Sequence, residues 1–159
     1  GHRRRALING LPHMTYAVLR ERGFDKALAE AGLPRGSAPV RCAEVTAVEG
    51  EQVAGELLSL PEPPTAIVCA TDAQALGAMA AVKARGLRVG FDVSVSGYGN
   101  TEAAAYADPP LTTIDHAIVS NGRHLADLLL RRMAGEDPES LTRLEPVQMI
   151  ERASIGAPA

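Results

Sequence analysis

One stretch of the sequence, residues 63–100, predicts a strand, a helix and a second strand in immediate succession. Residues 66–70 form a short apolar run that suits a strand covered on both faces, as in parallel sheets. Residues 71–74, Thr-Asp-Ala-Gln, have capping-box spacing, in which the Gln side chain reaches back to the cap, so a helix should begin there and end at Gly86. Alternation over residues 93–97 predicts the second strand. This order predicts an α/β fold.

The same unit predicts a ligand site, because both of its strands end in loops at one edge of the sheet. Thr71 and Asp72 follow the first strand, and Gly99 and Asn100 follow the second. In open α/β sheets, ligands bind at the carboxyl ends of the strands. Arg20 falls in the first turns of an earlier predicted helix, near the same edge, where its guanidinium could bind a hydroxyl pair or a carboxylate. A solvated helix charge is the alternative for Arg20.

Strands and helices alternate along the rest of the chain, which predicts a three-layer, doubly wound, mostly parallel sheet. The first helix, expected over residues 15–31, should bury five apolar side chains: Leu19, Phe24, Ala27, Leu28 and Ala31. The other expected strands are residues 5–9, 40–45, 111–114, 141–144 and 147–151, and the other expected helices are residues 49–60, 102–106 and 118–134.

Composition and charge narrow the range of functions that this chain can have. Hydrophobic residues make up 46% of the chain and aromatic residues only 3%, which is typical of helix-covered sheets with cores of Ala, Leu, Val and Ile. The net charge of −3 argues against this segment binding nucleic acid by itself. No apolar stretch approaches the roughly 20 residues of a membrane span. Cys42 and Cys69 lack metal-site spacing and are expected to be buried free thiols in a reducing compartment.

Three patterns suggest catalysis or a cofactor, and each has a stronger structural explanation. Residues 97–102 begin like a dinucleotide-binding fingerprint but carry Glu102 where the third glycine belongs. Asp115 and His116 are adjacent, but neighbouring strand residues face opposite sides and no nucleophile elbow accompanies them. His116 and His124 lack a third ligand at metal-site spacing. We therefore expect no catalytic residue, no metal and no cofactor.

Several segments resemble, in order and spacing, the bacterial transcriptional repressors of the lactose/galactose-repressor (LacI/GalR) family: GHRRRALI, ALAEAGLP, PTAIVCATDAQALGAMAAVKARGLRVGFDVSVSGYGN, DPPLTTI and LLLRRMAGEDP. The resemblance covers nearly the whole chain. It implies the C-terminal part of the effector-binding region, which is similar to a type I periplasmic binding protein. Residues 1–112 and 138–159 would form one lobe, and residues 114–136 a crossover and a helix that packs in a missing N-terminal lobe. The helix-turn-helix would precede Gly1.

The resemblance also implies a function. In that family two lobes clasp a small molecule, often a sugar or a nucleoside-like compound, and the change in lobe geometry alters the grip of a homodimer on its operator in the cytoplasm. The implied partners are a polar small-molecule effector, a second copy of the chain, and operator DNA through the absent helix-turn-helix, with no membrane. Leu76 and residues 48–53 resemble dimer-contact positions.

Carried over position by position, the resemblance assigns an effector pocket. Arg20 matches the family's effector-binding arginine, and Tyr16, one turn earlier, matches another pocket position. His116 and Ile118 fall on the segment that crosses back to the first lobe. The other assigned pocket positions are Val45, Thr71, Asp72, Gly99 and Asn100.

Three of these positions depart from the family pattern. Val45 stands where a ring-stacking aromatic often sits, Thr71 where Asn is usual, and Gly99 where Asp is usual. A sugar hydroxyl left unpaired in a buried site costs about 1–3 kcal/mol. We therefore hypothesise an effector that is not a typical hexose, or a pocket that relies on its remaining polar side chains, Arg20, Asp72 and Asn100.

Two other function classes stay open: a periplasmic or extracellular solute-binding receptor, which shares the fold, and, more distantly, a Rossmann-type enzyme. The last long helix raises a separate expectation. Its apolar stripe, formed by Leu125, Leu128, Leu129 and Met133, would lack its normal cover in this chain and should promote association.

Overall fold

A four-stranded parallel sheet lies at the centre of the computed structural model, which describes residues 1–34, 36 and 38–158. Its strand order is β2-β1-β3-β4, and β5 and β6 form an antiparallel pair. In chain order the elements are β1 (Arg5–Asn9), α1 (Thr15–Glu30), β2 (Val40–Cys42), α2 (Ala47–Leu58), β3 (Ala66–Cys69), α3 (Asp72–Ala84), β4 (Ser94–Ser96), α4 (Glu102–Ala105), β5 (Thr113–Asp115), α5 (Ile118–Met133), η1 (Pro138–Leu141, a 3₁₀ helix) and β6 (Gln148–Ile150).

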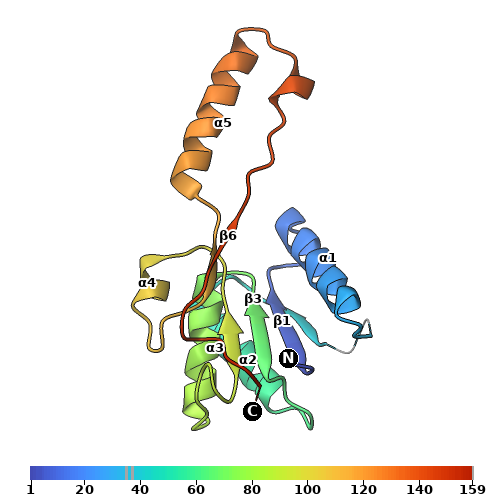
Figure 1. Ribbon diagram of the computed structural model, residues 1–159, viewed down its shortest axis with the longest axis vertical. Coiled ribbons are helices and arrows are strands. Elements are labelled where there is room, and N and C mark those ends of the chain that lie inside the picture. The colour runs from blue at the N-terminus through green and yellow to red at the C-terminus, as the bar shows by residue number, and fades with distance from the viewer. Residues whose placement is uncertain (35, 37, 159) are drawn as a thin grey trace.

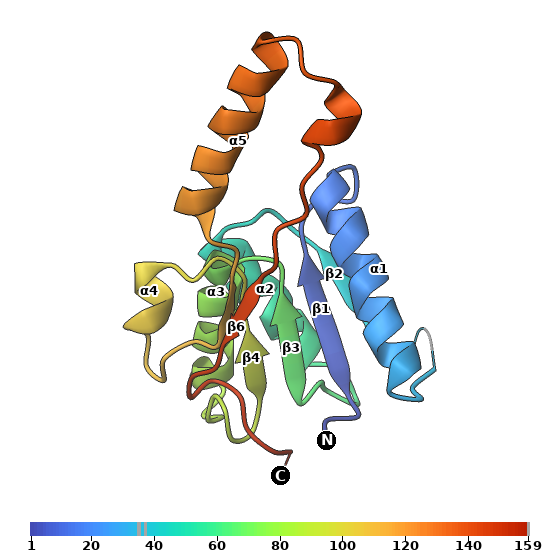
Figure 2. The ribbon, with the colours of Figure 1, turned by 45° about the horizontal axis from the view of Figure 1, so that its top comes forward.

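The β5 segment continues the sheet beyond β4. The Gly97 amide donates to the Thr112 carbonyl at 3.0 Å, and the Gly99 amide donates to the Ile114 carbonyl at 2.8 Å. Helix α1 covers one face of the sheet, while α2 and α3 pack together on the other (Figures 1 and 2). The predicted three-layer, doubly wound, mostly parallel α/β architecture is therefore confirmed.

Small residues allow α2 and α3 to pack closely. A Cβ on Gly77 would collide with the Ala47 carbonyl, and a Cβ on Gly50 would collide with the backbone of Gln74. The core between these helices and the sheet consists mainly of Ala, Val, Leu and Ile side chains, as the composition predicted, together with Met79 and Cys69.

Helix α3 begins after its N-cap Thr71, as predicted, but its capping box is incomplete. The Thr71 hydroxyl accepts a hydrogen bond from the Gln74 amide at 3.3 Å. The Gln74 side chain does not reach back to Thr71; its Nε2 donates to the carbonyls of Asn9 and Glu44 instead. Gln74 is fully buried, and its Nε2 bonds the end of β1 and the loop after β2, while its Oε1 has no partner among the described residues. Gly86 ends the helix with a φ of +71°.

The predicted burial of α1 is largely wrong. Leu28 is buried and Phe24 half-buried, but Leu19, Ala27 and Ala31 are exposed, and Ala17 is the other buried residue of the helix. Within the described ranges, α1 lies alone over its face of the sheet, so only the side that touches β1 is covered (Figure 2). Amphipathic spacing identified the helix but overestimated the width of its buried stripe.

Two smaller expectations also fail. Cys42 is exposed, because it lies on the edge strand β2, whereas Cys69 is buried in β3; both are free thiols. Residues 141–144 do not form a strand. Helix η1 ends at Leu141, and the next residues run beside α5, where none of the described strands is available for pairing.

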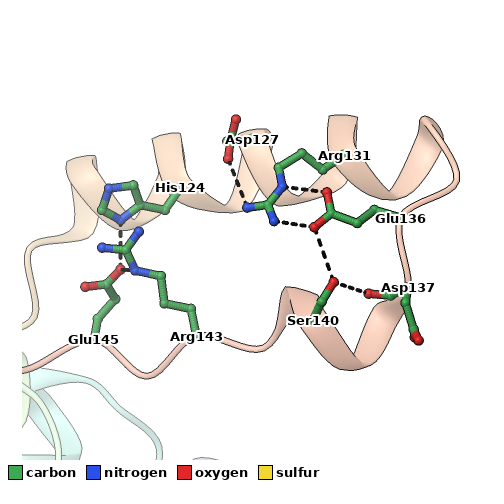
Figure 3. Close-up of polar contacts among 8 residues, drawn as sticks. All are labelled: His124, Asp127, Arg131, Glu136, Asp137, Ser140, Arg143 and Glu145. Atoms are coloured by element: carbon green, nitrogen blue, oxygen red, sulfur yellow. Dashed lines mark hydrogen bonds and ion pairs between the residues drawn. The ribbon is translucent and has the colours of Figure 1, made fainter.

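Helix α5 stands apart from the sheet and is joined to it by β5 on the way out and by β6 on the way back (Figure 1). None of its residues is buried, and Leu125 and Met133 are 69% and 74% exposed. Polar contacts tie α5 to the returning chain (Figure 3). His124 Nδ1 lies 2.8 Å from Glu145 Oε1, and Arg131 Nε donates to Glu136 at 2.8 Å.

The two ends of the described chain meet at the opposite, amino edge of the sheet (Figure 1). The His2 imidazole lies 2.9 Å from Thr65 Oγ1 through Nδ1, and 3.0 Å from both Ser94 Oγ and the Gly156 carbonyl through Nε2. One side chain thus links the entry to β1, the loop before β3, the start of β4 and the C-terminal tail.

Candidate functional site

The loop after β1 is held rigidly and places the start of α1. Asn9 is buried; its Nδ2 donates to the Ala17 carbonyl at 2.9 Å, and its Oδ1 accepts from the Gly10 amide at 2.9 Å. A Cβ on Gly10 would collide with the ring and hydroxyl of Tyr16. Glycine is therefore needed there for the Tyr16 ring to lie against the loop.

Four side chains at the carboxyl edge of the sheet form a stacked ladder. The Arg20 guanidinium carbon lies 4.9 Å from the centre of the Tyr16 ring and 4.2 Å from the centre of the Tyr98 ring. The Tyr98 ring stacks on the His116 ring, with centroids 5.1 Å apart and planes 26° apart. The ladder joins α1, the loop after β4 and the segment after β5, so it brings together three of the predicted site residues, Tyr16, Arg20 and His116.

Asp72 is not on the surface of this edge. Its side chain is only 1% exposed, and both carboxylate oxygens are bonded internally. One oxygen accepts from the Thr101 amide at 2.7 Å and from the Thr101 hydroxyl at 3.0 Å, and the other accepts from the Thr113 hydroxyl. A Cβ on Gly97 would collide with this carboxylate. Asp72 thus fixes the loop after β4 to β5.

Asn100 is also held by internal hydrogen bonds. Its Nδ2 donates to Asp115 at 3.0 Å, and its Oδ1 accepts from the Arg152 guanidinium at 2.7 Å. Asn100 has a φ of +50° and Gly99 a φ of +137°, a value that L side chains rarely adopt. The two residues form a sharp turn after β4, and the Asn100 side chain bonds this turn to Asp115 at the end of β5 and to Arg152 just after β6.

The acid and the imidazole at positions 115 and 116 do not form a catalytic pair. Asp115 accepts from the Ala117 amide at 2.7 Å and from Asn100. These two hydrogen bonds, with a smaller contribution from the nearby His116, lower the pKa of Asp115 below its ordinary value of 3.8. The buried Nδ1 of His116 has no hydrogen-bond partner among the described residues.

The remaining predicted site residues differ in accessibility. Thr71 is half-buried and engaged as the helix cap, and Gly99 is half-buried in the turn. Val45 lies in the loop after β2 and is 38% exposed, without a ring contact to the ladder. All eight predicted positions follow carboxyl ends of strands or open α1, but only three join the ladder.

A cavity of about 330 Å³ lies beside the ladder, on the α1 face of the sheet. Arg20 and Tyr98 line it together with mainly apolar side chains, including Leu7, Phe24, Val68, Ile114 and Met149. The carboxyl edge of the sheet therefore presents a cation in contact with two rings, next to an apolar wall. Among the described residues, no group of three or more His, Cys, Asp or Glu side chains is placed to hold a metal ion.

Tyr98 is the site residue that the sequence analysis missed. It lies in the segment Gly-Tyr-Gly-Asn, which begins like a dinucleotide-binding fingerprint but lacks its third glycine. The only available signal was an aromatic residue in a loop at the carboxyl edge of a chain with just 3% aromatic residues.

The family model for the periplasmic binding protein-like domain matches residues 1–155. The chain belongs to this family. Within the periplasmic binding protein-like domain family it is similar to the transcriptional repressor CytR of Escherichia coli K12, with 36% identity over 99% of this chain and 46% of the repressor. The PurR repressor of Haemophilus influenzae PittEE is 36% identical over 98% of this chain and 44% of its own length.

Solved structures agree with the sequence relatives. A dimeric lac repressor with a C-terminal deletion superposes with a TM-score of 0.90 at 35% identity, over 99% of this chain and 57% of the other. The lac repressor dimer bound to operator and an anti-inducer superposes with a TM-score of 0.89 at 34% identity, over 99% and 54% of the two chains. The predicted relation to the effector-binding region of LacI-family repressors is therefore confirmed.

The chain spans about half the length of the curated relatives it matches. These relatives are named as helix-turn-helix-type transcriptional repressors. Throughout the described ranges, no helix has the length and apolar character that crossing a bilayer requires.

Proposed function

We propose that this chain is part of the effector-sensing region of a LacI/GalR-type transcriptional regulator. A small molecule binds at the carboxyl edge of the sheet, between this lobe and a partner lobe, and controls operator binding through a helix-turn-helix outside the 159 residues. The regulator acts in the cytoplasm, and this chain performs no chemistry of its own.

The observation that carries the proposal is the ladder of Tyr16, Arg20, Tyr98 and His116 beside the cavity. It lies where open α/β sheets bind ligands, and it joins the body of the sheet to the segment that leads to α5. A ligand that contacts the ladder therefore touches both the lobe and the crossover. Such a contact can change the position of one relative to the other.

The predicted pocket residues have three roles in this proposal: some contact the effector, some border it, and some hold the surrounding loops. Tyr16, Arg20 and His116 contact the effector, and Thr71, Val45 and Gly99 border it. Asp72 and Asn100 act differently from the initial expectation. Their hydrogen-bonding groups are used within the protein, so they hold the loop after β4 and the crossover strands in place.

We assign residues 1–112 and 138–159 to this lobe, and residues 114–136 to a crossover and a helix that packs in the partner lobe. The exposed apolar side chains of α5 support this division. We further propose a homodimer through the face that carries Leu76 and residues 48–53. Val48 is 75% exposed there, and Leu76 and Met79 line a shallow apolar pocket nearby.

Operator binding by the complete regulator tests the proposal. Selection from random DNA yields a binding site, and fluorescence anisotropy then measures its affinity with and without candidate effectors. An effector should change operator affinity by about 5- to 150-fold, the usual range of allosteric coupling. Arg20→Ala should abolish the response and leave operator affinity without effector unchanged.

The same assay separates the alternative class. A solute-binding receptor of the same fold would bind a small molecule but select no DNA sequence. Sequence-specific DNA binding that no small molecule alters would contradict the sensing function.

A further inference from the structure

The Arg20 guanidinium contacts two aromatic rings. Tyr16 and Tyr98 contribute the rings, at 4.9 and 4.2 Å from the guanidinium carbon. Within the described part of the chain, no hydrogen bond or ion pair engages the N–H groups of Arg20. A guanidinium carries five N–H donors in its plane, and a ring above or below that plane satisfies none of them.

Among the described residues, no carboxylate forms an ion pair with Arg20. Two carboxylates at the same end of the sheet hydrogen-bond other groups: Asp72 bonds Thr101 and Thr113, and Asp115 bonds Ala117 and Asn100. Gly99 contributes no side chain, and its backbone conformation disfavours any other residue. A half-buried cation in contact with two rings has lost part of its water without gaining an anion.

We propose that this site takes an effector bearing an oxyanion, a carboxylate or a phosphate, which binds the edge of Arg20, and that Tyr98 is the positioning residue that orients the guanidinium. The inference rests on the proposed sensing function and names the ligand class for it. An oxyanion accepts two parallel N–H bonds from the fork of one guanidinium, and its charge neutralises Arg20. The apolar wall formed by Val68, Ile114 and Met149 receives the remainder of the ligand.

Tyr98 is well placed for this role because it is itself supported. Its second face stacks on His116 at 5.1 Å, and its carbonyl accepts from the Asp72 amide at 3.0 Å. The ring therefore has little freedom to turn away, and the guanidinium is oriented before a ligand arrives. A preorganised fork loses less conformational entropy on binding than a free arginine does.

Nuclear magnetic resonance of the arginine Nε–H groups tests the inference on the 159-residue chain, with acetate and inorganic phosphate as probes. Arg22, exposed on the same helix, is the internal control, and Arg20→Lys assigns the Arg20 signal. Arg20 should shift saturably with a midpoint about tenfold below that of Arg22. Chloride at equal ionic strength and neutral ribose should not produce this shift. A stronger response to phosphate identifies a phosphate ester as the ligand class, and a stronger response to acetate identifies a carboxylate.

Variants at Tyr98 test the positioning role. Tyr98→Leu should raise the Arg20 midpoint about fivefold, the value of one partly desolvated cation–π contact, whereas Tyr98→Phe, which keeps the ring, should restore it. Circular dichroism checks folding, and Tyr98→Met replaces the leucine variant if that variant unfolds. Equal midpoints for Arg20 and Arg22, or an unchanged midpoint in the folded variant without the ring, would overturn the inference.

The sensing function and the oxyanion ligand class can be refuted separately. If a neutral compound alters operator binding through Arg20 and the oxyanions do not shift its signal, the ligand class is wrong and the sensing function stands. If the oxyanions shift Arg20 selectively but no small molecule alters operator binding, the sensing function is wrong and the anion site stands.

Discussion

Replacing Asp72 by Ala should lower the free energy of unfolding by about 3 kcal/mol. The buried carboxylate accepts three hydrogen bonds, two from Thr101 and one from the Thr113 hydroxyl. Thr113 is buried, so leaving its hydroxyl donor without an acceptor costs about 1–3 kcal/mol, although the oxygen still accepts from the Asn100 amide. Exposed Thr101 recovers water and loses about 1 kcal/mol. Loss of the acid from the first turn of α3 adds about 0.5 kcal/mol. Asp72→Asn, which keeps the shape and loses the charge, should cost only about 1 kcal/mol.

Urea unfolding followed by circular dichroism at low protein concentration measures both values. A double-mutant cycle with Thr113→Val isolates the contact between the two side chains, and its coupling should be about 1–2 kcal/mol. The Asn variant should also retain the Arg20 resonance of the parent, because Asp72 is a structural residue here. An Ala variant as stable as the parent, or a coupling near zero, would refute the view that Asp72 pins the loop after β4 to β5.

Three further predictions concern other parts of the chain. The isolated chain should associate through the exposed apolar side chains of α5. The double variant Leu125→Glu with Leu129→Glu should be a monomer by light scattering. A parent chain that stays monomeric at high concentration with α5 ordered contradicts this prediction. The hydrogen bonds that lower the pKa of Asp115 stabilise the turn above its ordinary pKa of 3.8 and are lost as the pH falls through the lower pKa of the folded state. Carboxyl chemical shifts should report this loss, and Asp115→Asn should abolish it. Gly77→Ala should destabilise the fold by about 1–3 kcal/mol through overpacking. Gly23→Ala, with open space around it in α1, should stabilise the fold by about 0.5–1 kcal/mol. Thermal unfolding measures both changes, and equal effects would contradict the packing argument.

Much of the architecture could be predicted because it depends on local patterns. The apolar run before Thr71, the cap itself and the glycine at position 86 each mark a boundary that the structure confirms. The parallel order followed from the alternation of strands and helices. What failed depended on neighbours that local patterns do not describe. Leu19 is exposed because no second described helix lies beside α1, and Cys42 is exposed because β2 is an edge strand.

The site shows the same division. Placing Arg20 and the strand-end loops at one edge required only the topology of a parallel sheet. The roles within the edge required three-dimensional contacts between residues distant in sequence. Tyr98 meets Arg20 from 78 positions away along the chain, and Asp72 meets Thr113 from 41 positions away. A sequence pattern offers no means of telling a carboxylate that faces a ligand from one that bonds internal hydroxyls.

The first residues of the described chain and its C-terminal tail lie side by side, linked through His2. Gly1 lies against Pro158, and His2 bonds the Gly156 carbonyl, so a short linker would join the ends without strain. Circular permutants opened in the exposed turn after α5 should therefore fold. For the same reason the unit could be inserted into a host protein at a single point, with its ligand edge on the side away from the junction.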